Sequence, residues 1–245
     1  MAKNVFLKIC YNILFLLSFN PLLHLVVGFE VISSSCFKPD FKAKSPFEAN
    51  LNKLISSLSY WTPDIGYGRD SIGEGTDAVH GIAVCRADMN HDDCRTCVDG
   101  AGKEIRKRCS LNGGGIIWYA SCMLKYSKSK FFSQIDLENQ VHGCSPNKVP
   151  YPIALVREKR KLFRWLIKGA SKNEKFFAAG NMKVGLANPI YGFVQCSRDL
   201  SSVDCKKCLK KARRMLKTTC RTKACGFVFT GSCMIKYDSN PFIND

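Results

Sequence analysis

The apolar residues of the chain fall into two similar series, and each begins with the stripe of an amphipathic helix. From residue 47 to residue 58, apolar side chains recur at positions i, i+4, i+7, i+8 and i+11, which places them on one helix face. The same spacing returns 108 residues later, with a single polar member, Lys159. A helix is therefore predicted at the start of each half of the chain. The two stripes are Phe47, Leu51, Leu54, Ile55, Leu58 and Leu155, Lys159, Leu162, Phe163, Leu166.

A second helix is predicted later in each half, with strands around it. Within Cys205–Thr219, the cysteines and apolar residues again share one face at helical spacing. Asp93 and Asp204 stand where the N-terminus of such a helix favours a carboxylate. The tripeptide Gly113–Gly115 indicates a turn. Short runs typical of strands are Val79–Cys85, Ile116–Tyr126, Tyr191–Cys196 and Phe227–Tyr237. Each half is thus expected to be an α+β domain, an antiparallel sheet packed with two helices.

The cysteines repeat with the same period as these elements. Their flanks agree as well, since GIAVC is matched by GFVQC and SCMLKY by SCMIKY. Five cysteines recur with a displacement of 111 residues: Cys85, Cys94, Cys97, Cys109 and Cys122 match Cys196, Cys205, Cys208, Cys220 and Cys233. Cys36 matches Cys144 at the helix displacement of 108 residues. These matches predict two copies of one domain, over 29–143 and 144–245, with a short linker near Gln140–Gly143.

The N-terminus predicts secretion. Lys3 and Lys8 precede an apolar run that ends near Val27, which is typical of a cleaved signal peptide over 1–28. A membrane anchor is the alternative, but Pro21 and several polar residues interrupt the run. No later stretch could span a bilayer, so no transmembrane segment is expected in the mature chain. In a secreted protein, cysteines are expected to form disulfides.

The cysteine count of the expected mature chain is odd. Of the fourteen cysteines, thirteen follow the predicted signal peptide. Cys225 has no counterpart in the first half, where Gly114 stands at the matching offset. Cys225 is therefore the candidate for a thiol left over, or paired between chains.

The repeated cysteine ladder and its flanks resemble the plant cysteine-rich repeat secretory proteins, whose repeat is the ginkbilobin-homologous, or salt-stress response/antifungal, domain. Sequence alone leaves 15 pairings open for six cysteines. The resemblance implies three disulfides within each repeat. The implied pairs are Cys36–Cys109, Cys85–Cys94, Cys97–Cys122, Cys144–Cys220, Cys196–Cys205 and Cys208–Cys233.

The resemblance also locates the sugar contacts of the family's mannose-binding lectins, which are an Asn, an Arg and a Glu. This chain holds none of these three residues at the matching positions. The positions carry Phe37, Ile116 and Ser127 in the first repeat and Ser145, Phe227 and Asp238 in the second. Only Asp238 keeps a negative charge. The family fold is thus expected here, and mannose binding is not.

Neither a cofactor nor an enzymatic activity is predicted. The two Cys-x-x-Cys pairs, Cys94–Cys97 and Cys205–Cys208, are weak candidates for zinc or redox sites, because the second repeat offers no histidine to complete a shared ligand set. Sequence signatures of hydrolases and phosphate loops do not occur. Asp92 and Asp93 are adjacent, so on a helix they do not face each other.

Charge is the one unusual functional signal. Residues 36–143 carry 14 basic and 13 acidic residues, a net charge of +1, whereas residues 144–245 carry 21 and 6, a net charge of +15. Part of the excess lies on the first helix of the second half, at Arg157, Lys159, Arg160, Lys161, Arg164 and Lys168. The second helix carries the candidate anion-binding face, Lys206, Lys207, Lys210, Lys211, Arg213 and Arg214, with Lys217 beyond it. A merely solvated helix face is the alternative interpretation.

These patterns predict a non-enzymatic binding protein of the apoplast, and the resemblance adds a role in stress or defence. Its partner would be an anionic cell-wall glycan, an anionic lipid or an acidic protein. Nucleic acid fits the charge but not secretion. The alternative is a cationic antimicrobial or antifungal protein that acts on membranes through the second repeat.

Overall fold

The computed structural model describes residues 31–185 and 187–243, and these form two compact units that meet between Phe132 and Ser133 in the sequence. The predicted signal peptide, residues 1–28, lies outside the described residues. Within the described part of the chain, no helix has the length and apolar character needed to cross a bilayer.

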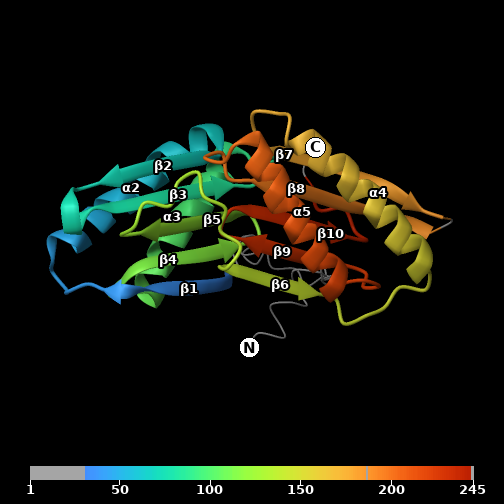
Figure 1. Ribbon diagram of the computed structural model, residues 1–245, viewed down its shortest axis with the longest axis horizontal. Helices are drawn as coiled ribbons and strands as arrows, with labels where there is room; N and C mark the ends of the chain where they lie inside the picture. The colour runs from blue at the N-terminus through green and yellow to red at the C-terminus, as the bar shows by residue number, and fades with distance from the viewer. Residues whose placement is uncertain (1–30, 186, 244–245) are drawn as a thin grey trace, which may run out of the picture. The chain divides into compact units, whose positions relative to one another are not determined.

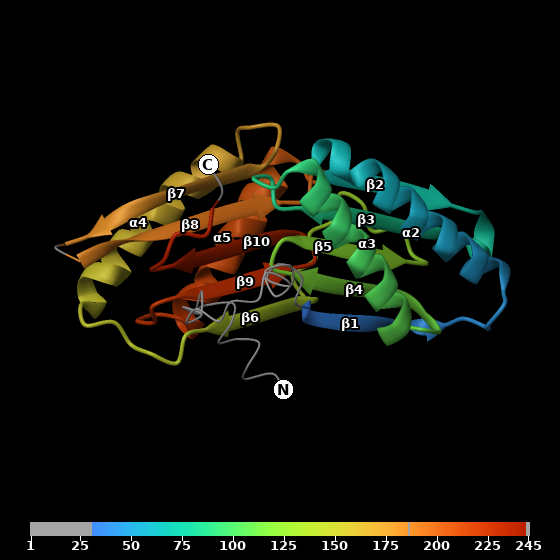
Figure 2. The same ribbon diagram turned by 180° about the vertical axis from the view of Figure 1, so that it is seen from behind.

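The first unit is a five-stranded antiparallel sheet with two long helices on one face (Figures 1 and 2). Its strand order is β1-β4-β5-β3-β2. The strands are β1 (Val31–Asp40), β2 (Tyr67–Ile72), β3 (Val79–Cys85), β4 (Asn112–Tyr119) and β5 (Cys122–Ser127). The helices are α2 (Pro46–Ile65), α3 (His91–Arg108) and the short 3₁₀ turn η2 (Gly75–Asp77).

The second unit repeats this topology element by element. Its antiparallel sheet has the order β6-β9-β10-β8-β7, which matches the first sheet strand for strand. The strands are β6 (Gln140–Cys144), β7 (Phe177–Val184), β8 (Ala187–Cys196), β9 (Gly226–Thr230) and β10 (Cys233–Asp238). The helices are α4 (Pro152–Ala170) and α5 (Ser202–Thr219). The prediction of two tandem α+β domains, each with two helices on an antiparallel sheet, is confirmed.

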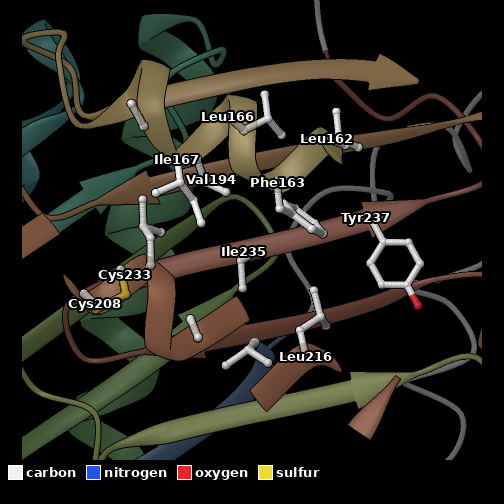
Figure 3. Close-up of a cluster of buried hydrophobic side chains, with 14 of the residues drawn as sticks. Leu162, Phe163, Leu166, Ile167, Val194, Cys208, Leu216, Cys233, Ile235 and Tyr237 are labelled. Carbon is white, nitrogen blue, oxygen red and sulfur yellow. A yellow bond between two sulfur atoms is a disulfide. The ribbon is translucent and has the colours of Figure 1, made fainter. Parts of the chain in front are cut away.

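The predicted stripes are the helix faces that build the two cores. Phe47, Leu51, Leu54 and Leu58 of α2 are at most 1% exposed. In the second unit, Leu162, Phe163 and Leu166 of α4 meet Val194 and Ile235 of the sheet and Leu216 of α5 (Figure 3). Since each helix buries one apolar face, its opposite face is left for polar residues.

Side-chain caps fix where three of the helices begin. Ser45, Asn90 and Ser201 accept hydrogen bonds from the backbone N–H three residues ahead, at the starts of α2, α3 and α5. At α3 and α5 those N–H groups belong to Asp93 and Asp204, so the predicted N-terminal carboxylates lie in the first turn.

Two local predictions were wrong. Gly113–Gly115 is not a turn but lies inside β4. A Cβ at Gly113 would collide with the carbonyl of Pro39, and one at Gly114 would lie 2.7 Å from the ring of Phe37, so glycine is required where β1 packs against this strand. Gln140–Gly143 is not a linker either, because it pairs with Thr230–Phe227 of β9 as part of the edge strand β6. That strand crosses the expected domain boundary at 143/144.

Six disulfides are described, three in each unit, and none of these six joins the two units. The paired Cα atoms lie 5.5–6.2 Å apart. The pairs are Cys36–Cys109, Cys85–Cys94, Cys97–Cys122, Cys144–Cys220, Cys196–Cys205 and Cys208–Cys233, the same six that the family resemblance implies.

In the full chain, Cys225, which the sequence predicts as the odd thiol of the mature protein, is not free. Cys225 is disulfide-bonded and only 1% exposed, and its bond is not one of the six above. The odd thiol predicted for a chain without residues 1–28 stays a prediction.

Candidate anion-binding face

Most basic residues of the second repeat lie on two helices that cover the same face of one sheet (Figure 1). At one end of this pair, the Ser202 hydroxyl donates to the carbonyl of Ser171. At the other end, the Lys159 Nζ donates to the carbonyl of Cys220 over 2.8 Å. The start of α5 therefore lies beside the end of α4, and the two helices run antiparallel.

Helix α5 presents its charges away from the core. Cys205, Cys208, Leu209, Ala212 and Leu216 are buried. Of the six residues predicted to form the anion-binding face, five have exposed side chains, and only Arg213 is half-buried. The five exposed residues are Lys206, Lys207, Lys210, Lys211 and Arg214.

Helix α4 adds cations to the same side of the unit, with one exception. Arg157, Arg160, Lys161, Arg164 and Lys168 are exposed. Lys159, which the sequence places in the same basic run, is only 6% exposed, because it belongs to the apolar stripe of the helix. It is therefore not part of the face.

Lys159 is instead held inside the second unit. Its Nζ donates to the carbonyls of Cys220 (2.8 Å) and Arg221 (3.1 Å) and lies 4.0 Å from the centre of the Tyr237 ring. Burial lowers the pKa of Lys159 to about 7. The equivalent residue of the first repeat is Leu51, which is fully buried.

Few of the exposed cations are neutralised by neighbouring acids. Glu158 binds Arg157 (2.6 Å) and Lys161 (3.1 Å), and Asp204 binds Lys207 (3.1 Å). Hydrogen bonds from Arg157 and Lys161 lower the pKa of Glu158. No ion pair among the described residues involves the remaining cations of this face, which we call the basic face: Arg160, Arg164, Lys168, Lys206, Lys210, Lys211, Arg213, Arg214 and Lys217.

Arg213 marks the place where the two helices bring their charges together. Burial lowers the pKa of Arg213, and the positive charges of Arg164, Arg214 and Arg160 lower it further. Helical spacing predicts only that these arginines lie on two separate helices, and it does not indicate that they come together. Alignment of the two repeats does carry a signal, since a glycine, Gly102, stands in the first repeat where Arg213 stands in the second.

The first repeat has no equivalent of this face. Its helix α3 carries acids among its bases, and two of its arginines are ion-paired. Arg106 binds Glu48 of α2 (2.7 Å), and Arg108 binds Glu104 one turn away (2.7 Å). Asp99 stands where the second repeat has Lys210. The two units thus share a fold but differ in surface potential.

The positions of the family's mannose contacts have structural roles here. Ile116 and Phe227 are fully buried in the sheets. Side-chain oxygens of Ser127, Ser145 and Asp238 accept hydrogen bonds from the backbone N–H two residues ahead, over 3.1 Å in each case. These three side chains therefore stabilise turns. Burial raises the pKa of Asp238 to about 6.

The two Cys-x-x-Cys pairs are likewise committed to the fold. Cys94 is bonded to Cys85 and Cys97 to Cys122, so the two cysteines of the motif do not bond each other. The second repeat bonds Cys205 and Cys208 in the same way. In the described ranges, no group of histidine, cysteine and acidic side chains is arranged to hold a metal ion.

Comparison with known proteins agrees with this architecture. The model of the salt stress response/antifungal family matches the chain twice, at residues 35–129 and 144–240. An antimicrobial ginkbilobin-2-like protein of Castanea crenata is 39% identical over 223 residues, which cover 91% of this chain and 92% of the relative. The cysteine-rich repeat secretory protein 38 of Arabidopsis thaliana is 40% identical over 205 residues, covering 83% and 81%.

Solved structures show the same tandem arrangement. The tandem DUF26 ectodomain of the Arabidopsis thaliana cysteine-rich receptor-like protein PDLP5 matches with a TM-score of 0.71 and 26% identity, over 85% of this chain and 98% of that one. The corresponding ectodomain of PDLP8 matches with a TM-score of 0.77 over 86% and 98%; at 22% identity it supports the fold alone. The chain therefore belongs to the salt stress response/antifungal family and consists of two tandem copies of its domain.

Proposed function

We propose that this chain is a non-enzymatic binding protein of the apoplast whose second repeat binds an anionic cell-wall polysaccharide through the basic face. The observation that carries the proposal is the unequal charge of two units with one fold. Residues 144–245 have a net charge of +15 and residues 36–143 a net charge of +1. A charge difference that the fold does not require indicates a surface used for binding.

A polymer suits this surface better than a small ligand. The cations lie along two helices, and α5 alone carries them from Lys206 to Lys217, a rise of about 16 Å. Single exposed ion pairs contribute at most about 1 kcal/mol. Several weak contacts along one chain add up, because each later contact forms intramolecularly.

Location outside the cell supports a cell-wall partner. Relatives carry the name of secretory proteins, and the solved structures that share the fold are ectodomains. The disulfides also suit an oxidising compartment. Uronate-containing polysaccharides are the anionic polymers of plant cell walls, so their carboxylates are the expected ligand groups.

A membrane-active antimicrobial protein is the second candidate. One relative is named as antimicrobial, and the second repeat exposes large apolar side chains beside its cations. These are Tyr151, Ile153, Trp165 and Val203. Membrane binding needs an apolar stripe that is continuous beside the charges. Here Ile153 lies at the start of α4, whereas Trp165 packs against Gly180 of β7, so the apolar residues are scattered. We therefore favour the polysaccharide.

The test is retention of the full mature protein on immobilised polygalacturonate across a series of salt concentrations. Retention should fall steeply with salt, because exposed charges are screened over about 8 Å at physiological ionic strength. Charge reversal by Lys206→Glu, Lys210→Glu and Arg213→Glu should abolish it. The matched control reverses three exposed lysines of the first repeat, Lys53, Lys103 and Lys107, and should keep most of the retention.

Two results would contradict the proposal. Equal loss in both triple variants would mean that only net charge matters. Retention that does not change with salt concentration would mean that the charges do not cause the binding. Leakage of anionic vesicles, abolished by the same second-repeat variant, would favour the antimicrobial candidate instead.

A further inference from the structure

At three positions of the seam between its two helices, the second repeat has arginine where the first has an uncharged residue. In the second repeat, Arg160 and Arg164 lie one turn apart on α4, and Arg213 of α5 takes the position of Gly102, the residue of α3 that packs against α2 in the first repeat. The matching residues of the first repeat are Asn52, Ser56 and Gly102. Three uncharged residues are thus replaced together by three arginines.

In the first repeat, glycine lets the two helices touch. A Cβ at Gly102 would lie 2.5 Å from Cγ2 of Ile55, so any larger residue would push α2 and α3 apart. Gly102 is buried in this contact. In the second repeat, Arg213 occupies the equivalent position and is half-buried. The position that allows close helix packing in one repeat thus carries an arginine in the other.

Gathering these arginines is unfavourable for the protein by itself. Like charges repel, and partial burial reduces the solvation that would screen them. Burial and the charges of Arg164, Arg214 and Arg160 all disfavour the charged form of Arg213. Within the described residues, no carboxylate forms an ion pair with Arg160, Arg164 or Arg213. An anion bound between them would relieve this repulsion.

We propose that the seam is a binding subsite for one carboxylate of an acidic oligosaccharide, held by Arg160, Arg164 and Arg213. The inference rests on the proposed function and identifies where on the basic face recognition occurs. Arginine suits this role because its planar guanidinium donates two parallel hydrogen bonds to a carboxylate, which a lysine ammonium cannot do. The lysines around the seam supply charge without such geometry.

The flanking cations extend the subsite along the helices. Lys206, Lys210 and Lys217 share with Arg213 the spacing of one helix stripe, with steps of four, three and four residues. They therefore continue the seam in both directions along α5. An extended chain with regularly spaced carboxylates would place one group among the arginines and its neighbours beside these lysines.

The decisive experiment separates arginine geometry from charge. The full mature protein and two double variants are titrated with a short oligogalacturonate by calorimetry at physiological salt. Arg164→Lys with Arg213→Lys keeps every charge of the seam but removes two guanidinium forks. The matched control, Arg157→Lys with Arg221→Lys, makes the same exchange in the same unit outside the seam. The seam variant should bind about tenfold more weakly, the loss expected for one charge-assisted hydrogen bond, and the control should bind as the wild type does.

A second readout keeps the subsite testable even if the polysaccharide is not the ligand. The Nε–Hε NMR signals of Arg164 and Arg213 are followed during titration with sodium sulfate, with sodium chloride at equal ionic strength as the control. Saturable shifts with sulfate support the seam as an anion subsite, even where wild-type protein fails to bind polygalacturonate and the proposed function falls. Equal weakening in both double variants, or no shift of these signals with either anion, would overturn the inference.

Discussion

The buried Lys159 should make the stability of the second unit depend on pH. The informative change is Lys159→Leu, because leucine is the residue that the first repeat has at this position. The substitution removes a charged side chain that is 6% exposed. Among the described residues, the Lys159 ammonium contacts the carbonyls of Cys220 and Arg221 and the Tyr237 ring. The adjacent carboxylate, Glu158, is bound to Arg157 and Lys161 instead.

The size of the effect follows from the shift in pKa. The pKa of Lys159 is about 7 in the folded protein, against 10.5 for an ordinary lysine. Between these values the unfolded chain binds more protons than the folded one, so stability rises with pH by about 1.4 kcal/mol per unit. From pH 7 to pH 9, the wild type should gain about 2 kcal/mol from this residue alone. Below pH 7 both states are protonated, and the folded state carries the full cost of the buried charge.

The measurement is the difference in unfolding free energy between wild type and Lys159→Leu in urea at several pH values. Pulsed hydrogen exchange at one fixed pH, with peptides from α4 and α5, reports on the second unit separately from the first. Titration of all other groups cancels in the difference. The leucine variant leaves the Arg221 carbonyl without its donor, at a cost of about 1–3 kcal/mol, but this cost does not change with pH.

The control is Lys168→Leu, which removes an exposed lysine of the same helix. Its difference from the wild type should stay constant between pH 7 and pH 9. If the Lys159→Leu difference also stayed constant, Lys159 would have an ordinary pKa, and the description of its environment would be wrong.

Three further predictions concern the rest of the fold. Replacing Cys97 and Cys122 by alanine should destabilise the first unit by about 2–4 kcal/mol in urea unfolding and leave the second unit unchanged; destabilisation of both would contradict independent stapling. The pKa of the Asp238 carboxyl is raised from 3.8 to about 6, so stability should fall by about 2 kcal/mol as pH rises from 4 to 7, because the folded state holds the proton more tightly. Asp238→Asn should remove this dependence, and an unchanged profile would contradict it. Calorimetric titration with mannose should show no saturable binding, because Ile116 and Phe227 are buried and offer no polar side-chain groups; a millimolar or lower dissociation constant would refute this.

The sequence predicts the core of each unit because its helices and central strands are strongly patterned. The apolar stripe of α2 is buried, and β3, β5 and β10 are buried at nearly every position. Each of these patterns also recurs in the other repeat, which strengthens the prediction. Edge strands escape detection for the opposite reason. Both β1 and β7 are partly exposed along most of their length and mix polar with apolar residues, so neither shows a clear alternation.

The site is harder to predict than the core, because it depends on how helices meet. Net charge and helical spacing are enough to indicate the exposed lysines of α5. Net charge alone does not separate Lys159, which is buried, from its neighbour Arg160, which is exposed, although helical spacing places Lys159 on the apolar stripe. The convergence of Arg164 and Arg213 depends on the antiparallel packing of α4 on α5, which is a tertiary property. The substitution of Arg213 for Gly102 between the repeats is the one trace of it in the sequence.

Lysine footprinting would test the central claim most directly, because it locates the contact without any mutation. The full mature protein is acetylated briefly, free and bound to polygalacturonate, and each lysine is quantified by mass spectrometry. We expect the polymer to protect Lys206, Lys210 and Lys217 from acetylation. Lys53, Lys103 and Lys107 of the first repeat should react at the same rate in the free and the bound protein. Protection spread evenly over both repeats, or protection of the first repeat alone, would contradict a binding surface on α4 and α5.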